Sequence, residues 1–271
     1  MIETYQFLLS LKLLEFEINE LTDYSKECSA CFELLRTKLD ELSRFITSEE
    51  NEQKWRQWGS RSDIQESSDK LRETSVRALC DIEKYQSICT YNHEIDISQY
   101  LSLLSQSVKN ELELFGIHEQ SKVLFIGAGA FPITALTIAK ETGAAVMGLD
   151  IDLEAVELAR NVAKVSGLDA IVSFSHQSVK ELPFTKSATH IIIASLVKNK
   201  LEVLEDVKGI MNPEARVILR YGNGLKSMFN YPLETDLSAE WVQIKNSQSN
   251  AIYDTIILEK SPALVSMQGK E

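Results

Sequence analysis

The hydrophobic pattern of this chain changes near residue 118, and that change constrains the fold more than any other feature. Before it, apolar residues recur at steps of three and four, the period of amphipathic helices. Three runs show this period: Phe7, Leu11, Leu14, Ile18 and Leu21; Phe32, Leu35, Leu39, Leu42 and Ile46; Ile97, Leu101, Leu104 and Val108. The segment contains one glycine before residue 116, Gly59, and no proline. Residues 1–118 are therefore predicted to form an all-helical domain.

One stretch inside this helical part has a different composition. Residues 48–70 are polar apart from Trp55, Trp58 and Ile64. Because they show no extended apolar period, we expect a long, partly exposed connection between helices.

From Ser121 onward, short apolar runs alternate with helix-like stretches. The predicted strands are Val123–Ile126, Ala145–Leu149, Ala170–Phe174, His190–Ala194 and Arg216–Arg220. Predicted helices start at Ile133 and cover Leu153–Ser166 and Lys200–Met211. This alternation indicates a parallel sheet with helices on both faces. Two further runs, Trp241–Lys245 and Ala251–Glu259, flank Asn246–Asn250 and predict a hairpin that gives the sheet an antiparallel edge. Residues 119–271 are thus expected to form an α/β, Rossmann-like domain.

Charge and hydropathy exclude some classes of function. The net charge is −12, which argues against sequence-independent nucleic-acid binding, since that needs Lys and Arg to neutralise phosphates. The N-terminal stretch lacks a basic start followed by an unbroken apolar run, so no signal peptide is expected. No run of apolar residues is long enough to cross a bilayer. We expect a cytoplasmic protein without membrane association.

The cysteines do not form a recognisable metal site. Cys28 and Cys31 make one CxxC, but a zinc site needs a second pair at comparable spacing. Cys80 and Cys89 are nine residues apart, and the histidines are scattered. The default for such cysteines is a buried reduced thiol, with a metal or redox role as the alternative. No bound metal is predicted.

A glycine-rich turn follows the first predicted strand, as Gly127-Ala128-Gly129. Glycines at this point let the backbone approach a ligand, and the next helix N-terminus attracts negative groups. Asp150 lies 21 residues after Gly129, where a carboxylate can hold both ribose hydroxyls; Asp152 is expected to cap the next helix. A GxG also occurs as a tight turn in unrelated α/β proteins. The GxG turn together with Asp150 fits a site for NAD or for S-adenosylmethionine. The alanine in place of a third glycine and the predicted C-terminal hairpin favour S-adenosylmethionine.

The loop after the third predicted strand is expected to meet the adenine ring in such a fold. The candidates for contact with the ring are His176, Gln177 and Ser178. A solvated loop is the alternative for each of them.

Three motifs extend this interpretation. In the first, the glycine-rich turn continues into Pro132, an aliphatic residue and Thr. The second is Ala194-Ser195-Leu196-Val197, which follows the fourth predicted strand. The third is RYGNGLKSMFNYP, which begins at Arg220, the last residue of the fifth predicted strand. Together they resemble the nicotianamine synthase family, which includes the bacterial enzymes that make staphylopine-type metallophores. The resemblance covers residues 121–232 and implies a class I S-adenosylmethionine-dependent transferase, with Pro132, Ser195 and Leu196 beside the cofactor. The third motif is the most specific, since family positions are filled by Arg220, Gly224, Lys226, Tyr231 and Pro232.

The helical part resembles the same family more loosely. The family places a helical domain over the nucleotide site, and Ala78–Tyr85 looks like its acidic and aromatic helix that reaches into the catalytic cavity. The chain is similar in size to the bacterial staphylopine-pathway enzyme, whereas plant members are longer and have a richer acidic motif here.

The resemblance implies a reaction that does not move the methyl group. An amine attacks the carbon of the aminocarboxypropyl arm next to the sulfonium, and methylthioadenosine leaves. In the staphylopine type the arm is transferred once, to the α-amine of a histidine, with D-histidine as the expected acceptor. The next enzyme of the pathway and a second copy of the chain are expected partners.

The attacking amine must lose a proton, so a carboxylate or a tyrosine must lie within hydrogen-bond reach. We choose Glu83 as the base; on a helix it shares a face with Leu79 and Ser87, which leaves a solvated surface position as the alternative. Tyr85 and Tyr91 are candidates to contact the amine or the sulfonium, because an aromatic face attracts a cation. Core packing is the alternative for both tyrosines.

The carboxylates of donor arm and acceptor need cationic or hydrogen-bonding partners. Arg220, Lys226 and Tyr231 are the candidates; the first two follow the fifth strand, near the edge where ligands sit, and Arg can grip a carboxylate with two bonds. An ion pair within the protein is the alternative for Arg220.

Three other functions compete with this one. An ordinary methyltransferase of the same fold would release S-adenosylhomocysteine. A non-catalytic nucleotide-binding module would not react at all, although the intact turn and Asp150 argue against it. A dinucleotide oxidoreductase is disfavoured because residues 121–271 hold one nucleotide-sized half.

Overall fold

The computed structural model describes residues 2–246 and 251–261, without side-chain detail at 103–110, 245 and 246. The side chains of Leu104 and Val108 are therefore not described, and most of the predicted hairpin loop, Asn246–Asn250, lies outside the described residues. The chain forms two compact units: Met1–Ile82, Tyr221–Glu234 and Ser247–Asp254 make the first, and Glu83–Arg220, Thr235–Asn246 and Thr255–Glu271 make the second. Helix α4, Ser62–Tyr91, contributes to both units. The division into domains 1–118 and 119–271 stays a prediction.

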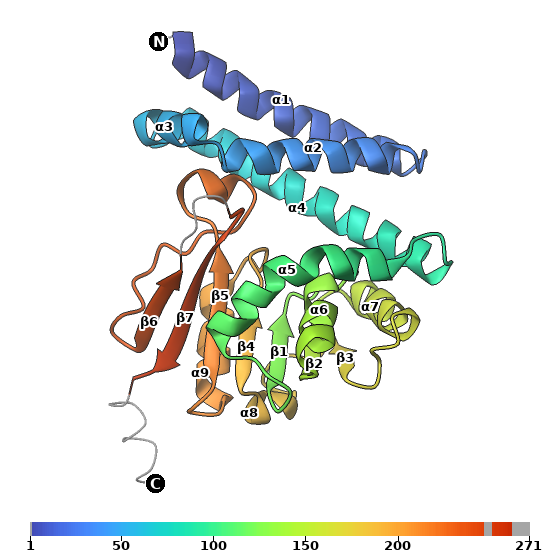
Figure 1. Ribbon diagram of the computed structural model, residues 1–271. Helices are drawn as coiled ribbons and strands as arrows, with labels where there is room; N and C mark the ends of the chain where they lie inside the picture. The colour runs from blue at the N-terminus through green and yellow to red at the C-terminus, as the bar shows by residue number, and fades with distance from the viewer. Residues whose placement is uncertain (1, 247–250, 262–271) are drawn as a thin grey trace. The chain divides into compact units, whose positions relative to one another are not determined.

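The first unit is a set of helices around one apolar core. Helices α1 (Ile2–Ser25) and α2 (Cys31–Ile46) pack along each other (Figure 1). Helix α3 (Glu49–Trp58) and the 3-10 helix η1 (Gly224–Met228) pack together as well. The core includes Phe7, Leu11, Ile18, Leu35, Leu39, Leu42, Ile46, Ile64, Leu71, Met228 and Phe229. The two predicted apolar periods between residues 7 and 46 are confirmed.

The prediction of a long connection at residues 48–70 is wrong. Helices α3 and α4 take up nearly all of it, and the turn between them is short. The Ser48 side chain accepts a hydrogen bond from the Asn51 amide and so caps α3, which stabilises a helix start. Glu50 pairs with Lys54 one turn later at 2.5 Å. Capping and such pairs stabilise a helix that lacks an apolar stripe.

The second unit is built on a seven-stranded sheet of order β3-β2-β1-β4-β5-β7-β6. The strands are β1 Lys122–Ile126, β2 Ala145–Leu149, β3 Val172–Ser175, β4 His190–Ile193, β5 Arg216–Tyr221, β6 Trp241–Asn246 and β7 Asp254–Lys260. Strands β1 to β5 are parallel, and β6 and β7 form the predicted antiparallel hairpin. The α/β Rossmann-like prediction is confirmed.

Helix α5, Ile97–Phe115, precedes β1. The helices that connect the parallel strands are α6 Ile133–Thr142, α7 Leu153–Val165, α8 Phe184–Ser187 and α9 Lys200–Ile210. The sequence pattern did not indicate the short α8. Because parallel crossovers are right-handed, α6 and α7 cover one face and α9 covers the other. The strand order reverses between β1 and β4, and ligands of such sheets bind at the carboxyl ends of the strands at that point.

Candidate active site

The turn after β1 is shaped by two glycines in the left-handed region. Gly127 has φ 81° and Gly129 has φ 69°, conformations that favour glycine. The amides of Gly127 and Ala128 donate to the carbonyl of Leu149 at 2.8 and 3.0 Å, which ties the turn to the end of β2. A Cβ on Gly127 would lie 2.7 Å from Val197 Cγ2. The turn is therefore a tight backbone cradle at the switch point of the sheet.

Asp150 lies at the carboxyl end of β2 and holds this cradle. Its Oδ2 accepts from the Gly129 amide at 2.9 Å, and its Oδ1 accepts from the Asp152 amide at 3.0 Å. Asp152 caps α7 by accepting from the Glu154 amide, as predicted. The structure thus places Asp150 against the glycine turn. Its contact with ribose hydroxyls stays a prediction.

Glu83 comes from the last third of α4 and meets the same cradle. A Cβ on Gly129 would collide with Glu83 Oε2, so the carboxylate lies directly against the glycine. Burial and the negative charge of Asp150 raise the pKa of Glu83 to about 8, while bonds from the amides of Ala130 and Phe131 act in the opposite direction. A carboxyl group with a pKa near neutrality is suited to accept and return protons.

Ser87 follows one helical turn after Glu83 and contacts the same loop. Its hydroxyl is buried and donates to the Ala130 carbonyl at 2.7 Å. That carbonyl belongs to the peptide unit whose N–H, on Phe131, donates to Glu83. One peptide unit is therefore held at both ends by side chains of α4. Ser87 shares a helical face with Glu83, but its position in the sequence does not by itself indicate this contact.

The neighbours of Glu83 on α4 differ in their placement. Lys84 Nζ lies 2.7 Å from Asp152 and 2.6 Å from Glu154, which links α4 to the start of α7. The Tyr85 hydroxyl bonds the thiol of Cys89 on the same helix. Tyr91 is 56% exposed and lies about two turns beyond Glu83. The structure does not bring Tyr91 to the Glu83–Asp150 group, and the roles of both tyrosines stay predictions.

The predicted adenine loop starts beside Asp150. The Asp150 amide donates to the Ser175 carbonyl at 3.2 Å. His176, Gln177 and Ser178 follow and are exposed, and the Ser178 hydroxyl bonds Glu181 at 2.9 Å. The loop lies at the expected edge of the sheet, while contact with a ring stays a prediction.

The loop after β4 borders the cradle from the other side. The Ala194 amide donates to the Ile126 carbonyl at 3.0 Å. Lys200 is 2% exposed, and its Nζ donates to the carbonyls of Ser195 and Val197, both at 2.6 Å. A buried lysine thus fixes the loop that carries Ser195 and Leu196. Pro132, the last predicted cofactor contact, is buried at the start of α6.

Arg220 lies near the end of β5 and is 6% exposed. Its guanidinium donates to Glu111 at 2.5 Å and lies 5.8 Å from the ring centre of Phe125. The ion pair is the alternative that the sequence left open. A contact with a substrate carboxylate stays a prediction.

Lys226 and Tyr231 belong to the first unit and also have protein partners. Lys226 Nζ lies 2.8 Å from Asp254, with both side chains largely buried. The Tyr231 hydroxyl lies 3.1 and 3.0 Å from the two carboxylate oxygens of Glu73, and the Arg72 guanidinium lies 5.2 Å from its ring centre. Burial and the Glu73 charge raise the pKa of Tyr231 to about 12. No sequence pattern indicated Arg72 or Glu73, because both lie at ordinary positions of a helix.

The described residues provide no group of three or more His, Cys, Asp and Glu side chains that could hold a metal ion. The four cysteines are free thiols. Cys89 is buried as expected, but Cys28 and Cys80 are exposed, so the prediction of buried thiols is wrong for these two. Among the described helices, none is long and apolar enough to cross a membrane.

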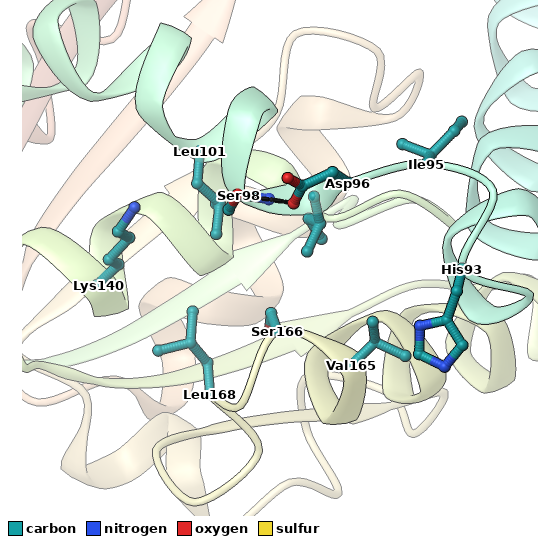
Figure 2. A pocket seen from close by; sticks show the side chains of 10 residues that line it. His93, Ile95, Asp96, Ser98, Leu101, Lys140, Val165, Ser166 and Leu168 are labelled. Atoms are coloured by element: carbon teal, nitrogen blue, oxygen red, sulfur yellow. Dashed lines mark hydrogen bonds between the residues drawn. The ribbon is translucent and has the colours of Figure 1, made fainter.

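A cavity of about 540 Å³ lies elsewhere in the second unit, where α6 and α7 end. Figure 2 shows Lys140, Ser166 and His93 around it, with Asp96 bonded to Ser98. The Asp96 carboxylate caps α5 by accepting from the Ser98 amide. None of the sequence-predicted site residues lines this cavity.

Comparison with known proteins connects these features to one family. The nicotianamine synthase protein family matches residues 60–265. An L-histidine 2-aminobutanoyltransferase of Pseudomonas aeruginosa (strain UCBPP-PA14) is 40% identical over 252 residues, which cover 93% of this chain and 96% of the relative. A protein of the same name from Yersinia pestis is 34% identical over 256 residues, covering 93% and 95%.

The solved structures agree at the level of the fold. A crystal structure of a point mutant of MtNAS superimposes with a TM-score of 0.74 at 18% identity, covering 93% of this chain and 98% of that one. A crystal structure of such a mutant in complex with S-adenosylmethionine has a TM-score of 0.70, also at 18% identity, covering 92% and 98%. The motifs, the fold and the extent of the matches agree: this chain belongs to the nicotianamine synthase family.

Proposed function

We propose that this enzyme transfers the 3-amino-3-carboxypropyl group of S-adenosylmethionine to the α-amine of histidine and releases methylthioadenosine, as a step in the synthesis of a metallophore. The observation that carries the proposal is the position of Glu83, a carboxyl group with a pKa of about 8 set against the Gly129 turn. Identity of 34–40% over 93% of the chain to proteins named for this transfer supports the same reaction.

The reaction is a displacement at carbon. The acceptor nitrogen forms a bond to the arm carbon next to sulfur, the carbon–sulfur bond breaks, and its electron pair stays on sulfur. The nitrogen then carries an excess proton, which Glu83 accepts. S-adenosylmethionine supplies the transferred arm and a neutral leaving group.

The rest of the site positions the reactants. Gly127 and Gly129 open the backbone to the donor, and Asp150 holds the turn while it offers oxygens to the ribose. An in-line displacement gains most of its rate from such alignment. Gln177, Ser178, Ser195 and Leu196 complete the proposed donor site.

Arg220, Lys226 and Tyr231 are the proposed partners of the substrate carboxylates. Each would have to exchange or share its present partner, which is Glu111, Asp254 or Glu73. Tyr85 and Tyr91 are retained as proposed contacts of the amine or the sulfonium.

Histidine is the proposed acceptor, and its stereochemistry is open to direct test. The resemblance in sequence led us to expect D-histidine, whereas the relatives are named for L-histidine. The names favour the L-enantiomer for this chain.

The test is to incubate the purified protein with S-adenosylmethionine and a panel of amino acids that includes D-histidine, L-histidine and glutamate. Chromatography with mass detection identifies the nucleoside and the product. We expect methylthioadenosine and a histidine enlarged by one aminobutanoate unit. Release of S-adenosylhomocysteine would make the protein a methyltransferase and overturn the proposal. Absence of both products and of cofactor binding would indicate a non-catalytic module.

A metallophore pathway needs further steps after this transfer. We therefore include the next enzyme of the pathway among the proposed partners, along with a second copy of this chain. A cytoplasmic location belongs to the same proposal.

A further inference from the structure

Helix α1 is apolar on two opposite faces. Phe7, Leu11 and Ile18 point inward and are at most 3% exposed. The other face carries six large apolar side chains, each more than half exposed: Ile2, Tyr5, Leu9, Leu13, Phe16 and Tyr24. We call these six residues the outer stripe.

The outer stripe is continuous along the helix. At roughly 100° per residue, its six positions fall within an arc of about 100° on the side opposite the inward-facing residues. Glu20 and Asp23 are the charged residues within this arc, and Asp23, at its edge, pairs with Lys26. A helix that is apolar on two opposite faces normally buries both of them. The outer stripe therefore requires a partner.

The size of the outer stripe fits a protein interface. At on the order of 100 Å² for each half-exposed side chain, it presents about 600 Å² of apolar surface. Stable interfaces bury roughly 800 Å² per partner, and the flanking residues of α1 would add to this area.

We propose that the outer stripe packs antiparallel against the same stripe of a second copy, about a two-fold axis near Leu13. The inference deepens the proposed homodimer and does not depend on the reaction. With the axis between residues 12 and 13, Leu9 lies level with Phe16, whereas Leu13 lies within one residue of its own copy and Ile2 within one residue of Tyr24, an offset of about 1.5 Å. Tyr5 falls opposite Glu20, so that its phenol can donate to a carboxylate that accepts from Tyr24 of its own helix. The stripe is thus complementary to itself, as a two-fold interface requires.

Charge argues against a membrane as the occupant. Helices that lie on membrane surfaces carry Lys and Arg on their polar faces. The polar residues of α1 include Lys12 against Glu3, Glu15, Glu17 and Asp23, and the whole chain has a net charge of −12. An anionic lipid surface would repel such a helix.

The oligomeric state of the full-length protein tests the proposal. Sedimentation equilibrium should show a wild-type dimer, and Leu9→Glu with Leu13→Glu should weaken it by about 100-fold or more, since like charges would meet at the axis. Leu201→Glu, a matched change at an exposed position of α9, should leave the dimer intact. A monomeric wild type, a dimer that survives the double change, or equal loss in the control would overturn the proposal.

Cross-linking tests the register. Cys28, Cys31 and Cys80 are first replaced by Ser. On oxidation, Leu13→Cys should form a covalent dimer and Ile2→Cys should not, because the register separates the two copies of residue 2 by roughly 30 Å at about 1.5 Å per residue. Linkage at both positions would indicate parallel packing, and linkage at neither would indicate another surface; both results overturn the proposal.

Two controls separate this proposal from the others. Binding of the wild type to phosphatidylserine–phosphatidylcholine vesicles, with a monomer in solution, would favour a membrane and contradict the second copy. Methylthioadenosine release is assayed on the same samples. If the wild type is a dimer but releases no methylthioadenosine, the proposed reaction is overturned and the proposed interface stands. If the wild type is a monomer that releases methylthioadenosine, the interface is overturned and the reaction stands.

Discussion

The surroundings of Glu83 differ from those of Lys226, and the contrast separates a carboxyl group that can exchange its proton from a charge that is held in an ion pair. Lys226 lies 2.8 Å from Asp254 in a largely buried ion pair of the first unit. Glu83 faces backbone amides and the like charge of Asp150, and its pKa rises to about 8. A paired charge stabilises one arrangement, whereas a carboxyl group that lies near a like charge can exchange its proton near neutral pH.

The largest expected effect follows from removing the proton acceptor. Glu83→Gln should slow aminobutanoyl transfer by about 10²–10⁴-fold, with donor binding retained because size and fold are kept. Stopped assays of methylthioadenosine and calorimetric titration with S-adenosylmethionine measure the two quantities. Glu66→Gln is the matched control on α4, since that carboxylate forms an exposed pair with Lys70 away from the proposed site. Equal losses of transfer rate in both variants would show that Glu83 differs in no way from another carboxylate of α4.

Removing one partner of the buried ion pair should act on stability. Lys226→Met leaves Asp254 without its cation, and we expect a loss of about 3 kcal/mol in the free energy of unfolding. Urea denaturation measures it. Lys70→Met, which removes an exposed pair with Glu66, should cost less than about 1 kcal/mol. If the two changes cost the same free energy of unfolding, the buried Lys226–Asp254 pair stabilises the fold no more than an exposed pair does.

A side chain at the cradle should disturb both the backbone and Glu83. Gly129→Ala has to adopt φ 69° and collides with Glu83, so we expect a loss of about 2 kcal/mol in unfolding free energy and of donor binding. Gly167→Ala shares the backbone strain, with φ 72°, but its Cβ meets nothing within 4 Å. Thermal denaturation and donor titration distinguish the two. Normal donor binding by Gly129→Ala would contradict the proposal that S-adenosylmethionine binds against this turn.

The smallest expected effect concerns Ser87 as a positioning residue. Ser87→Ala frees the Ala130 carbonyl and should lower kcat by roughly tenfold, with a shift in the pH dependence of the rate. Ser75→Ala is the control, because the buried Ser75 hydroxyl bonds the Leu71 carbonyl of its own helix. A loss of stability without any change in the pH dependence would limit Ser87 to packing.

Local patterns predicted the order of elements in the second unit, since alternation of apolar strands and amphipathic helices is a short-range signal. They failed at residues 48–70, because α3 depends on a cap and on ion pairs instead of an apolar stripe.

The turn at Gly127 and Gly129 was recognisable from a short local motif, and Asp150 from its spacing of 21 residues. Their contacts with a donor stay predictions. The resemblance supplied Glu83. Pairs such as Lys226 with Asp254, or Tyr231 with Glu73, join residues that are distant in sequence. No local spacing encodes such partners, and the same limit applied to the bond from Ser87 to Ala130.

The most direct test of the account is the pH dependence of methylthioadenosine release at saturating donor and histidine. Because the pKa of Glu83 is raised to about 8, the ionised base is scarce below that pH, and the rate should rise as the pH passes through it. The same step should be absent from Glu83→Gln. A rate that is flat between about pH 6 and pH 10, or a profile that Glu83→Gln leaves unchanged, would contradict the assignment of Glu83 as the base.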